Sequence, residues 1–282
     1  MKTITLNNGV KMPQMGYGVY QVSPAECERC VLDAISMGYR MIDTAQAYHN
    51  EEGVGNAIQK CGVPREELFI VTKIWISNAG EEKAYASILE SLRNLKSDYI
   101  DLLLIHQPFG DYYGTYRAME RAYREGKVRA IGVSNFYPDR FIDLQEHVKI
   151  KPMVNQVETH VFNQQVEAQK YMEKYGCHIM SWGPFAEGLN DFFHNDVLTE
   201  IGKVYGKTLA QTALRFLIQR GVIIIPKSTH KERMQENISI FDFELTDAEM
   251  DSIATLDLGH SLFFSHYEPK MVEQFMQWEK AL

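Results

Sequence analysis

The stretch RMIDTAQAYHNEEGVG, residues 40–55, contains one complete strand–helix unit. Its apolar residues Met41 and Ile42 predict a short buried strand that ends at Asp43. A helix is expected over 50–61, after a turn that carries Tyr48. A carboxylate and a phenol at the end of a buried strand are costly to place for packing alone. The stretch therefore predicts a unit of the fold and a candidate chemical site together.

The same unit recurs along the whole chain. The expected strands are the apolar runs MGYGVY, RMID, LFIVTK, YIDLLLIH, VRAIGVS, MVNQVE, HIMSW and VIIIPKS. The expected helices cover 24–38, 50–61, 80–95, 113–125, 137–147, 164–175, 195–205, 208–220 and 230–238. The strands lack polar alternation, as expected when both faces of a sheet are covered. Eight such units favour an α/β fold of the (β/α)8 TIM-barrel type, with a doubly wound open sheet as the alternative.

Several local signals predict additions to this barrel. The segment ITLNNGVKMP, residues 4–13, predicts an N-terminal β-hairpin with its turn at Asn-Asn-Gly. The sequences SPAE at 23–26 and TDAE at 246–249 are typical of capping boxes, which start the first helix and one further helix after the barrel. Extra helices are thus expected after strands seven and eight, while the tail from Gly259 shows no regular pattern. No linker is evident, so residues 1–282 are expected to form a single domain.

Composition and charge exclude several classes of function. With 29 Lys and Arg against 37 Asp and Glu, the formal net charge is −8, and no basic run suggests nucleic acid or an anionic membrane as partner. The N-terminus lacks the apolar core of a secretory signal, and the apolar runs are too short to span a bilayer. The spacing of Cys27 and Cys30 falls within an expected helix, which favours packed thiols over a zinc or redox site. A cytoplasmic protein with reduced thiols and no metal is expected.

Functional side chains end most of the expected strands. They are Asp43 with Tyr48 in the loop behind it, Lys73, His106, Ser134 and Asn135, Asn155 and Gln156, Trp182, and Lys227 and Ser228. Taken one at a time, each has an ordinary structural explanation, such as a helix cap for Asp43. In a barrel, however, the carboxyl ends of all the strands meet at one rim. Packing gives no reason for carboxylate, ammonium, phenol and imidazole groups to gather there, so the pattern indicates an active site.

Six motifs give the chain a family resemblance. They are IDTAQAYHNEEGVG, VTKIW, LLLIHQP, GVSNF, NQVE and IPKSTHKERMQEN, and they run in order nearly from end to end. In sequence and spacing they resemble the aldo-keto reductase family, and the short loops resemble its bacterial members. The resemblance implies NADPH-dependent reduction of aldehydes or ketones in a TIM barrel.

The residues at the rim suit this chemistry. Carbonyl reduction needs an acid at the oxygen that becomes an alkoxide, and a free tyrosine, with a pKa of about 10, is a weak one. An ammonium at Lys73 is expected to lower the pKa of Tyr48, and Asp43 to hold that ammonium charged. His106 can donate a hydrogen bond to the same substrate oxygen. Family members use matching residues in these four roles.

The expected cofactor site is not of the Rossmann type, because no Gly-x-Gly-x-x-Gly follows the first strand. Ser134, Asn135 and Gln156 are assigned to the nicotinamide carboxamide, Trp182 to its ring, Gly183 and Phe185 to the pyrophosphate, Lys227, Ser228 and Arg233 to the 2′-phosphate, and Glu236 and Asn237 to adenine. Amides at a helix start beside Lys and Arg suit a dianion, so NADPH is expected over NADH.

The expected substrate pocket is lined by Tyr20, Trp75, Gln107 and Phe109, together with tail aromatics such as Phe263 and Phe264. Many relatives carry tryptophan where Tyr20 and Gln107 stand, so the mouth is expected to be more polar and to suit small aldehydes, dicarbonyls or keto-sugars. Two alternatives are a Schiff-base lyase that uses Lys73 and a non-catalytic, NADPH-binding regulatory member of the family. Many relatives are monomers, which makes a monomer the expected state.

Overall fold

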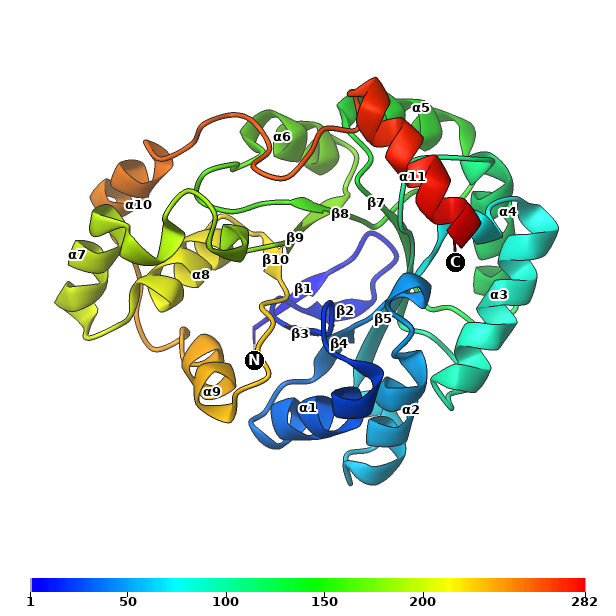
Figure 1. Ribbon diagram of the computed structural model, residues 1–282, viewed down its shortest axis with the longest axis horizontal. Coiled ribbons are helices and arrows are strands. Elements are labelled where there is room, and N and C mark those ends of the chain that lie inside the picture. Colours follow the sequence, from blue (N-terminus) through cyan, green and yellow to red (C-terminus); the bar gives the residue numbers. More distant parts are fainter. Residues whose placement is uncertain (1, 282) are drawn as a thin grey trace.

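The computed structural model describes residues 2–281 and has the architecture of a (β/α)8 barrel (Figure 1). Eight strands form one sheet in the order β10-β9-β8-β7-β6-β5-β4-β3, and each strand is parallel to its neighbours. The strands are β3 (Tyr17–Gly18), β4 (Met41–Asp43), β5 (Phe69–Ile74), β6 (Leu102–Ile105), β7 (Ile131–Ser134), β8 (Val154–Glu158), β9 (His178–Trp182) and β10 (Ile223–Ile224). All of them except the two ends of β9 are buried, as their apolar runs predicted.

A seam between the first and last strands closes the sheet. Met15 and Ile224 form a parallel bridge, Gly16 N–H donates to Ile224 O at 2.8 Å, and Ile224 N–H donates to Gln14 O at 3.0 Å. Gly18 lies so close to the other side that a Cβ atom there would stand 2.9 Å from the carbonyl oxygen of Ile225. The closed barrel is therefore confirmed, and the open-sheet alternative is wrong.

The helices surround the strands and cover the outer face of the sheet (Figure 1). Those that follow successive strands are α1 (Pro24–Ser36), α2 (Glu51–Lys60), α3 (Glu81–Asn94), α4 (Tyr112–Arg124), α5 (Pro138–His147), α6 (Val166–Lys174), α8 (Leu209–Gln219) and α9 (Lys231–Ile238). The additional ones are α7 (Asp196–Tyr205), α10 (Asp247–Ala254) and α11 (Pro269–Ala281). Short 3₁₀ turns are η1 (Gln46–Tyr48), η2 (Arg65–Glu67), η3 (Ile76–Asn78), η4 (Ala186–Gly188) and η5 (Phe192–His194). Among the described helices, none is long and apolar enough to cross a membrane.

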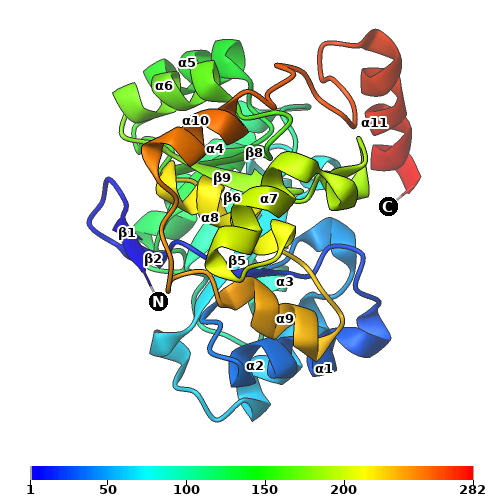
Figure 2. The same cartoon turned by 90° about the vertical axis from the view of Figure 1, so that its left-hand side faces the viewer.

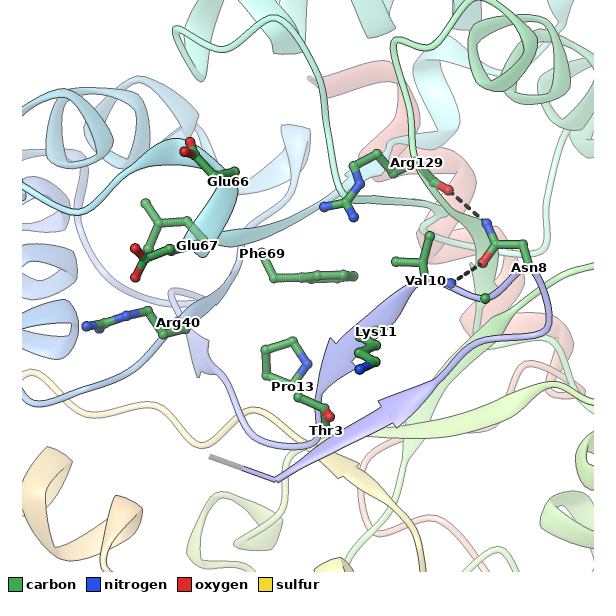
Figure 3. Close-up of a pocket in the computed structure, with 12 residues that line it drawn as sticks. Thr3, Asn8, Val10, Lys11, Pro13, Arg40, Glu66, Glu67, Phe69 and Arg129 are labelled. Atoms are coloured by element: carbon green, nitrogen blue, oxygen red, sulfur yellow. Dashed lines mark hydrogen bonds between the residues drawn. The ribbon is translucent and has the colours of Figure 1, made fainter.

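The expected N-terminal hairpin is present as β1 (Thr3–Thr5) and β2 (Lys11–Pro13), which pair antiparallel. The Asn8 side chain attaches it to the barrel by donating to Arg129 O at 2.9 Å. A pocket of about 700 Å³ lies between this hairpin and the segments that enter β4, β5 and β7. Figure 3 shows its lining, with Phe69 in the wall. This pocket adjoins the amino ends of the strands, so it is separate from the rim that carries the candidate catalytic groups.

Of the two expected capping boxes, one is absent and one is present. The expected capping box at Ser23 is wrong, because its hydroxyl contacts the Glu26 carboxylate at 3.1 Å and caps no backbone N–H. The box at Thr246 is confirmed, since Thr246 and Glu249 cap each other's backbone N–H groups.

The helix α11 was not expected, although its sequence contains a signal for it. Met271, Val272, Phe275 and Met276 recur at helical spacing after Pro269, and they pack against the cluster of Trp75, Ile76 and Phe109. Figure 2 shows α11 and the hairpin at opposite ends of the barrel. The tail is therefore an ordered part of the barrel mouth.

Candidate active site

A buried ion pair lies at the carboxyl ends of β4 and β5. Lys73 Nζ donates to Asp43 Oδ1 at 2.6 Å and to the carbonyl oxygen of Thr44 at 2.9 Å. The two charged side chains expose 0% and 3% of their surface. Burial lowers the pKa of Lys73 and raises the pKa of Asp43, and the ion pair opposes both shifts. The pair supplies a fixed cation inside the rim.

Tyr48 lies beside this cation at the end of η1, with its hydroxyl oxygen 3.4 Å from Lys73 Nζ. Asn50 fixes the loop, because its amide donates to Val19 O and Val22 O and accepts from the Thr44 hydroxyl.

The expected lowering of the pKa of Tyr48 does not appear in the structure. Burial, followed by the negative charge of Asp43 and the nearby Tyr20, raises the pKa of Tyr48 well above its ordinary value. The physical reason is that the phenolate would be desolvated and would stand near a carboxylate as well as an ammonium. The Tyr48 hydroxyl thus holds its proton at neutral pH.

His106 follows β6 and completes the group. Its ring meets the rings of Tyr48 and Trp75 edge-on, at centroid separations of 5.5 and 5.1 Å. Burial and the nearby Lys73 charge lower the pKa of His106, so the imidazole is neutral at pH 7. Its Nδ1 atom has no hydrogen-bond partner within residues 2–281.

A continuous hydrogen-bond chain links the ion pair to Trp182 across the rim. Trp182 Nε1 donates to Asn135 Oδ1 at 2.9 Å, and Asn135 Nδ2 donates to Ser134 Oγ at 3.2 Å. The Ser134 hydroxyl donates to Gln156 O at 2.8 Å, and Gln156 Nε2 donates to Asp43 Oδ2 at 2.9 Å. Asn135 has a positive φ of 61°, a conformation that asparagine tolerates better than most residues. The three side chains expected to bind a carboxamide therefore also orient Trp182 and Asp43.

The remaining expected cofactor residues lie after β9 and β10. Lys227 and Arg233 are exposed and form no ion pair within the part of the chain that the structure describes, whereas Lys231 is paired with Asp33 at 2.8 Å. Ser228 shapes the loop before α9, because its hydroxyl accepts from His230 N–H at 3.1 Å.

Four further cofactor candidates lie in α9 and in the loop after β9. Asn237 is buried, and the Glu236 carboxylate accepts from the Thr208 hydroxyl at 2.6 Å. Gly183 opens the loop after β9 with a φ of 63°, and the ring of Phe185 packs on Phe192 in the same loop.

Comparison with known proteins agrees with this geometry. Residues 8–258 match the Aldo/keto reductase family. The chain belongs to the aldo/keto reductase family. It is therefore an oxidoreductase that acts on carbonyl groups.

Individual members resemble this reductase over most of their length. It is 46% identical to the glyoxal reductase of Bacillus subtilis over 90% of this chain and 92% of the relative. It is 38% identical to the methylglyoxal reductase DkgA of Escherichia coli over 92% and 94% of the two chains. The crystal structure of MGS-M4, an aldo-keto reductase from a Medee basin deep-sea metagenome library, superposes with a TM-score of 0.91, at 40% identity and 94% and 98% coverage. A Bombyx mori aldo-keto reductase solved in complex with NADP gives a TM-score of 0.88, at 35% identity and 92% and 94% coverage.

The expected substrate residues differ in how far their side chains are exposed. Trp75 and Phe109 are 7% and 8% exposed and pack under α11, whereas Tyr20, whose ring lies 5.0 Å from that of Tyr48, is 52% exposed. Gln107 is 7% exposed, and its Oε1 atom is 2.6 Å from His266 Nε2 in the tail.

Sequence reasoning missed His266, Ser261 and Glu158, which tie the tail to the rim of the barrel. No local pattern marks these contacts, which join residues far apart in the chain.

Proposed function

We propose that this chain reduces aldehydes and ketones to alcohols, with NADPH as the hydride donor and Tyr48 as the general acid. The observation that carries the proposal is the position of Lys73. Its ammonium lies 2.6 Å from the Asp43 carboxylate and 3.4 Å from the Tyr48 hydroxyl, so a held cation adjoins the proton donor.

The four residues divide the work of proton transfer. Because the raised pKa keeps Tyr48 protonated, its O–H is available to the carbonyl oxygen as that oxygen becomes an alkoxide. The Lys73 ammonium stabilises the negative charge that develops on the Tyr48 oxygen as the proton leaves, and Asp43 holds the ammonium charged. Neutral His106, whose ring contacts that of Tyr48, donates a hydrogen bond that orients the carbonyl.

The residues of the chain fit NADPH, which when bound supplies the hydride. Trp182 offers an indole face held in place by Asn135. Lys227 and Arg233 lie near the amino end of α9 without a carboxylate partner in the described residues, as a 2′-phosphate site requires. Gly183 and Phe185 in the loop after β9 serve the pyrophosphate, and Ser228, Glu236 and Asn237 complete the adenosine end. The complexes of related enzymes with NADP support this choice.

Small dicarbonyls are the proposed substrates. The B. subtilis and E. coli relatives are named for glyoxal and methylglyoxal. The buried side chains of His106, Trp75 and Phe109 form one wall of the site. The Schiff-base alternative requires a neutral amine, whereas the Asp43 carboxylate favours the charged form of Lys73. Trapping of a substrate on Lys73 with borohydride would favour that alternative.

The decisive experiment measures NADPH oxidation with glyoxal, methylglyoxal, simple aldehydes, ketones and keto-sugars. Tyr48→Phe should lower kcat by at least about 100-fold and change the NADPH Kd little. Full turnover by this variant would overturn the assignment of Tyr48. Wild-type protein that binds NADPH but reduces none of these compounds would instead favour the non-catalytic alternative.

A further inference from the structure

The segment between α10 and α11 runs along the rim of the barrel, past α6, to the start of α11 (Figure 1). Residues 261–266 of this segment, here called the strap, run from the end of β8 to the residue that follows His106. Each end of the strap is attached to the rim by hydrogen bonds.

The first attachment is the buried carboxylate of Glu158, the last residue of β8. The Ser261 hydroxyl donates to Glu158 Oε2, and Leu262 N–H donates to Glu158 Oε1 at 2.9 Å. The same Ser261 oxygen accepts from the N–H groups of Phe263 and Phe264, at 3.0 Å each. One carboxylate and one hydroxyl therefore fix the turn that aims both phenylalanines.

The second attachment is His266, which is 3% exposed. Its Nε2 atom is 2.6 Å from Gln107 Oε1, a pure acceptor, so Nε2 carries the proton. Its Nδ1 atom is 3.3 Å from the Tyr137 hydroxyl, which can donate to it while accepting from His266 N–H. Both nitrogens of the neutral ring are thus hydrogen-bonded. The side-chain oxygen of Gln107, the residue after His106, is therefore bonded to the strap.

The two phenylalanines between the attachments cover Trp182. Phe263 meets the indole edge-on with centroids 5.2 Å apart, and Phe264 lies nearly parallel to it at 6.0 Å, with 22° between the planes. The His266 ring in turn stacks on Phe109 and Phe275, at 5.6 and 5.3 Å. The strap is therefore continuous with the wall formed by α11.

This arrangement makes the site asymmetric. His106 is only 9% exposed, whereas Tyr20 is half exposed. His266 packs on Phe109 and is hydrogen-bonded to Gln107, two of the expected pocket residues, so the attachment of the strap fixes the position of this wall.

We propose that His266 is a positioning residue that, through Gln107, latches the strap closed, and that the closed strap restricts this reductase to small carbonyl compounds such as short aldehydes and α-dicarbonyls. The inference rests on the proposed function for its substrate, but the latch itself is a property of the protein alone. Releasing the latch should enlarge the pocket toward α11 without moving the ion pair of Lys73 and Asp43.

Two variants separate the hydrogen bond of His266 from its packing. His266→Phe keeps a ring among Phe109 and Phe275 but removes the donor to Gln107. His266→Gln keeps an N–H the same number of bonds from Cβ as Nε2 but removes the ring. Ser261→Ala releases the other attachment and serves if His266→Phe does not fold.

The first measurement is hydrogen exchange of the amides in residues 262–268, without substrate. His266→Phe should exchange there about tenfold faster, the equivalent of one hydrogen bond, while His266→Gln stays within about twofold of wild type. The second is kcat/KM for methylglyoxal against 2-naphthaldehyde. His266→Phe and Ser261→Ala should raise the ratio in favour of the bulky aldehyde by about tenfold, mainly through KM.

Unchanged exchange in both His266→Phe and Ser261→Ala would overturn the latch. An equal fall in activity toward both aldehydes would overturn the role in selectivity, since that is the result of a merely structural residue. Wild-type protein that reduced neither aldehyde would defeat the proposed function, whereas the exchange measurement would still decide whether the strap is latched.

Discussion

The Lys73 ammonium lies 2.6 Å from the Asp43 carboxylate at a place where the two side chains expose only 0% and 3% of their surface. Taking two charges out of water costs several kcal/mol per ion, and their attraction repays this only when further hydrogen bonds complete the pair. Thr44 O and Gln156 Nε2 provide those bonds here. Because burying this pair costs the fold desolvation free energy, we infer that it serves the chemistry of Tyr48.

Breaking the pair should destabilise the fold, and removing both charges should not. Lys73→Met leaves Asp43 buried and uncompensated, at a cost of about 3–5 kcal/mol in urea unfolding. The double variant Lys73→Met with Asp43→Leu should recover most of that stability but remain inactive. Recovery of turnover in the double variant would contradict the role given to Lys73.

Arg233 should decide the preference for NADPH. Arg233→Ala removes a charge-assisted hydrogen bond worth about 1.5–3 kcal/mol, so the NADPH Kd should rise about 10- to 100-fold while the NADH Kd changes little. Lys231→Ala is the matched control, because Lys231 belongs to the same helix but is already paired with Asp33. Equal effects of the two substitutions on the Kd for NADPH would argue against a specific phosphate site.

His266 should make the fold less stable at acidic pH. Burial, followed by the Arg140 charge, lowers the pKa of His266 from 6.5 to about 4, while the Glu158 charge opposes the shift. Between those two values the unfolded chain binds the proton and the folded one does not. Stability should therefore fall as the pH decreases from about 7 to about 4, by roughly 3 kcal/mol for this residue, and level off below.

The measurement is urea unfolding across that range in wild type and in His266→Phe, which cannot titrate. His106 contributes in the same direction in both proteins, because burial lowers its pKa too. The difference between the two curves isolates His266. Parallel curves would show that His266 titrates normally in the fold.

Gly18 should tolerate no side chain. A Cβ atom there would stand 2.9 Å from the backbone oxygen of Ile225, which cannot turn aside as a side chain could. Gly18→Ala should therefore destabilise the barrel by about 1–3 kcal/mol, seen as a lower Tm. An unchanged Tm would mean that the seam can widen freely.

Much of the fold could be predicted because its signals are local. Apolar runs, caps and turn residues lie within a few positions of the element that they define, so the helices from α1 to α9 begin and end within about two residues of the expected positions. The rim was predictable for a related reason, since parallel strands bring Asp43, Lys73 and His106 to one end of the barrel. The capping box at Ser23 was misjudged, because its hydroxyl contacts the Glu26 side chain instead.

What could not be predicted depends on contacts between distant parts of the chain. His266 meets Gln107 across 159 positions, and nothing in the sequence around either residue indicates that contact. The raised pKa of Tyr48 likewise comes from burial and from the distance to Asp43 rather than from residue type. The α11 helix differs from these, since its apolar spacing was readable and was overlooked.

The seam between the first and last strands of the barrel has a consequence for the synthesis of the protein. Residues 14–18 are among the first to leave the ribosome, and their partners at 224–226 emerge only near the end of synthesis. Until then β3 and β9 each present an open edge of unpaired backbone groups, the kind of surface on which nascent chains stick to one another. Premature termination before β10 would leave that state permanent, so truncated chains should collect in inclusion bodies while the full-length chain stays in solution.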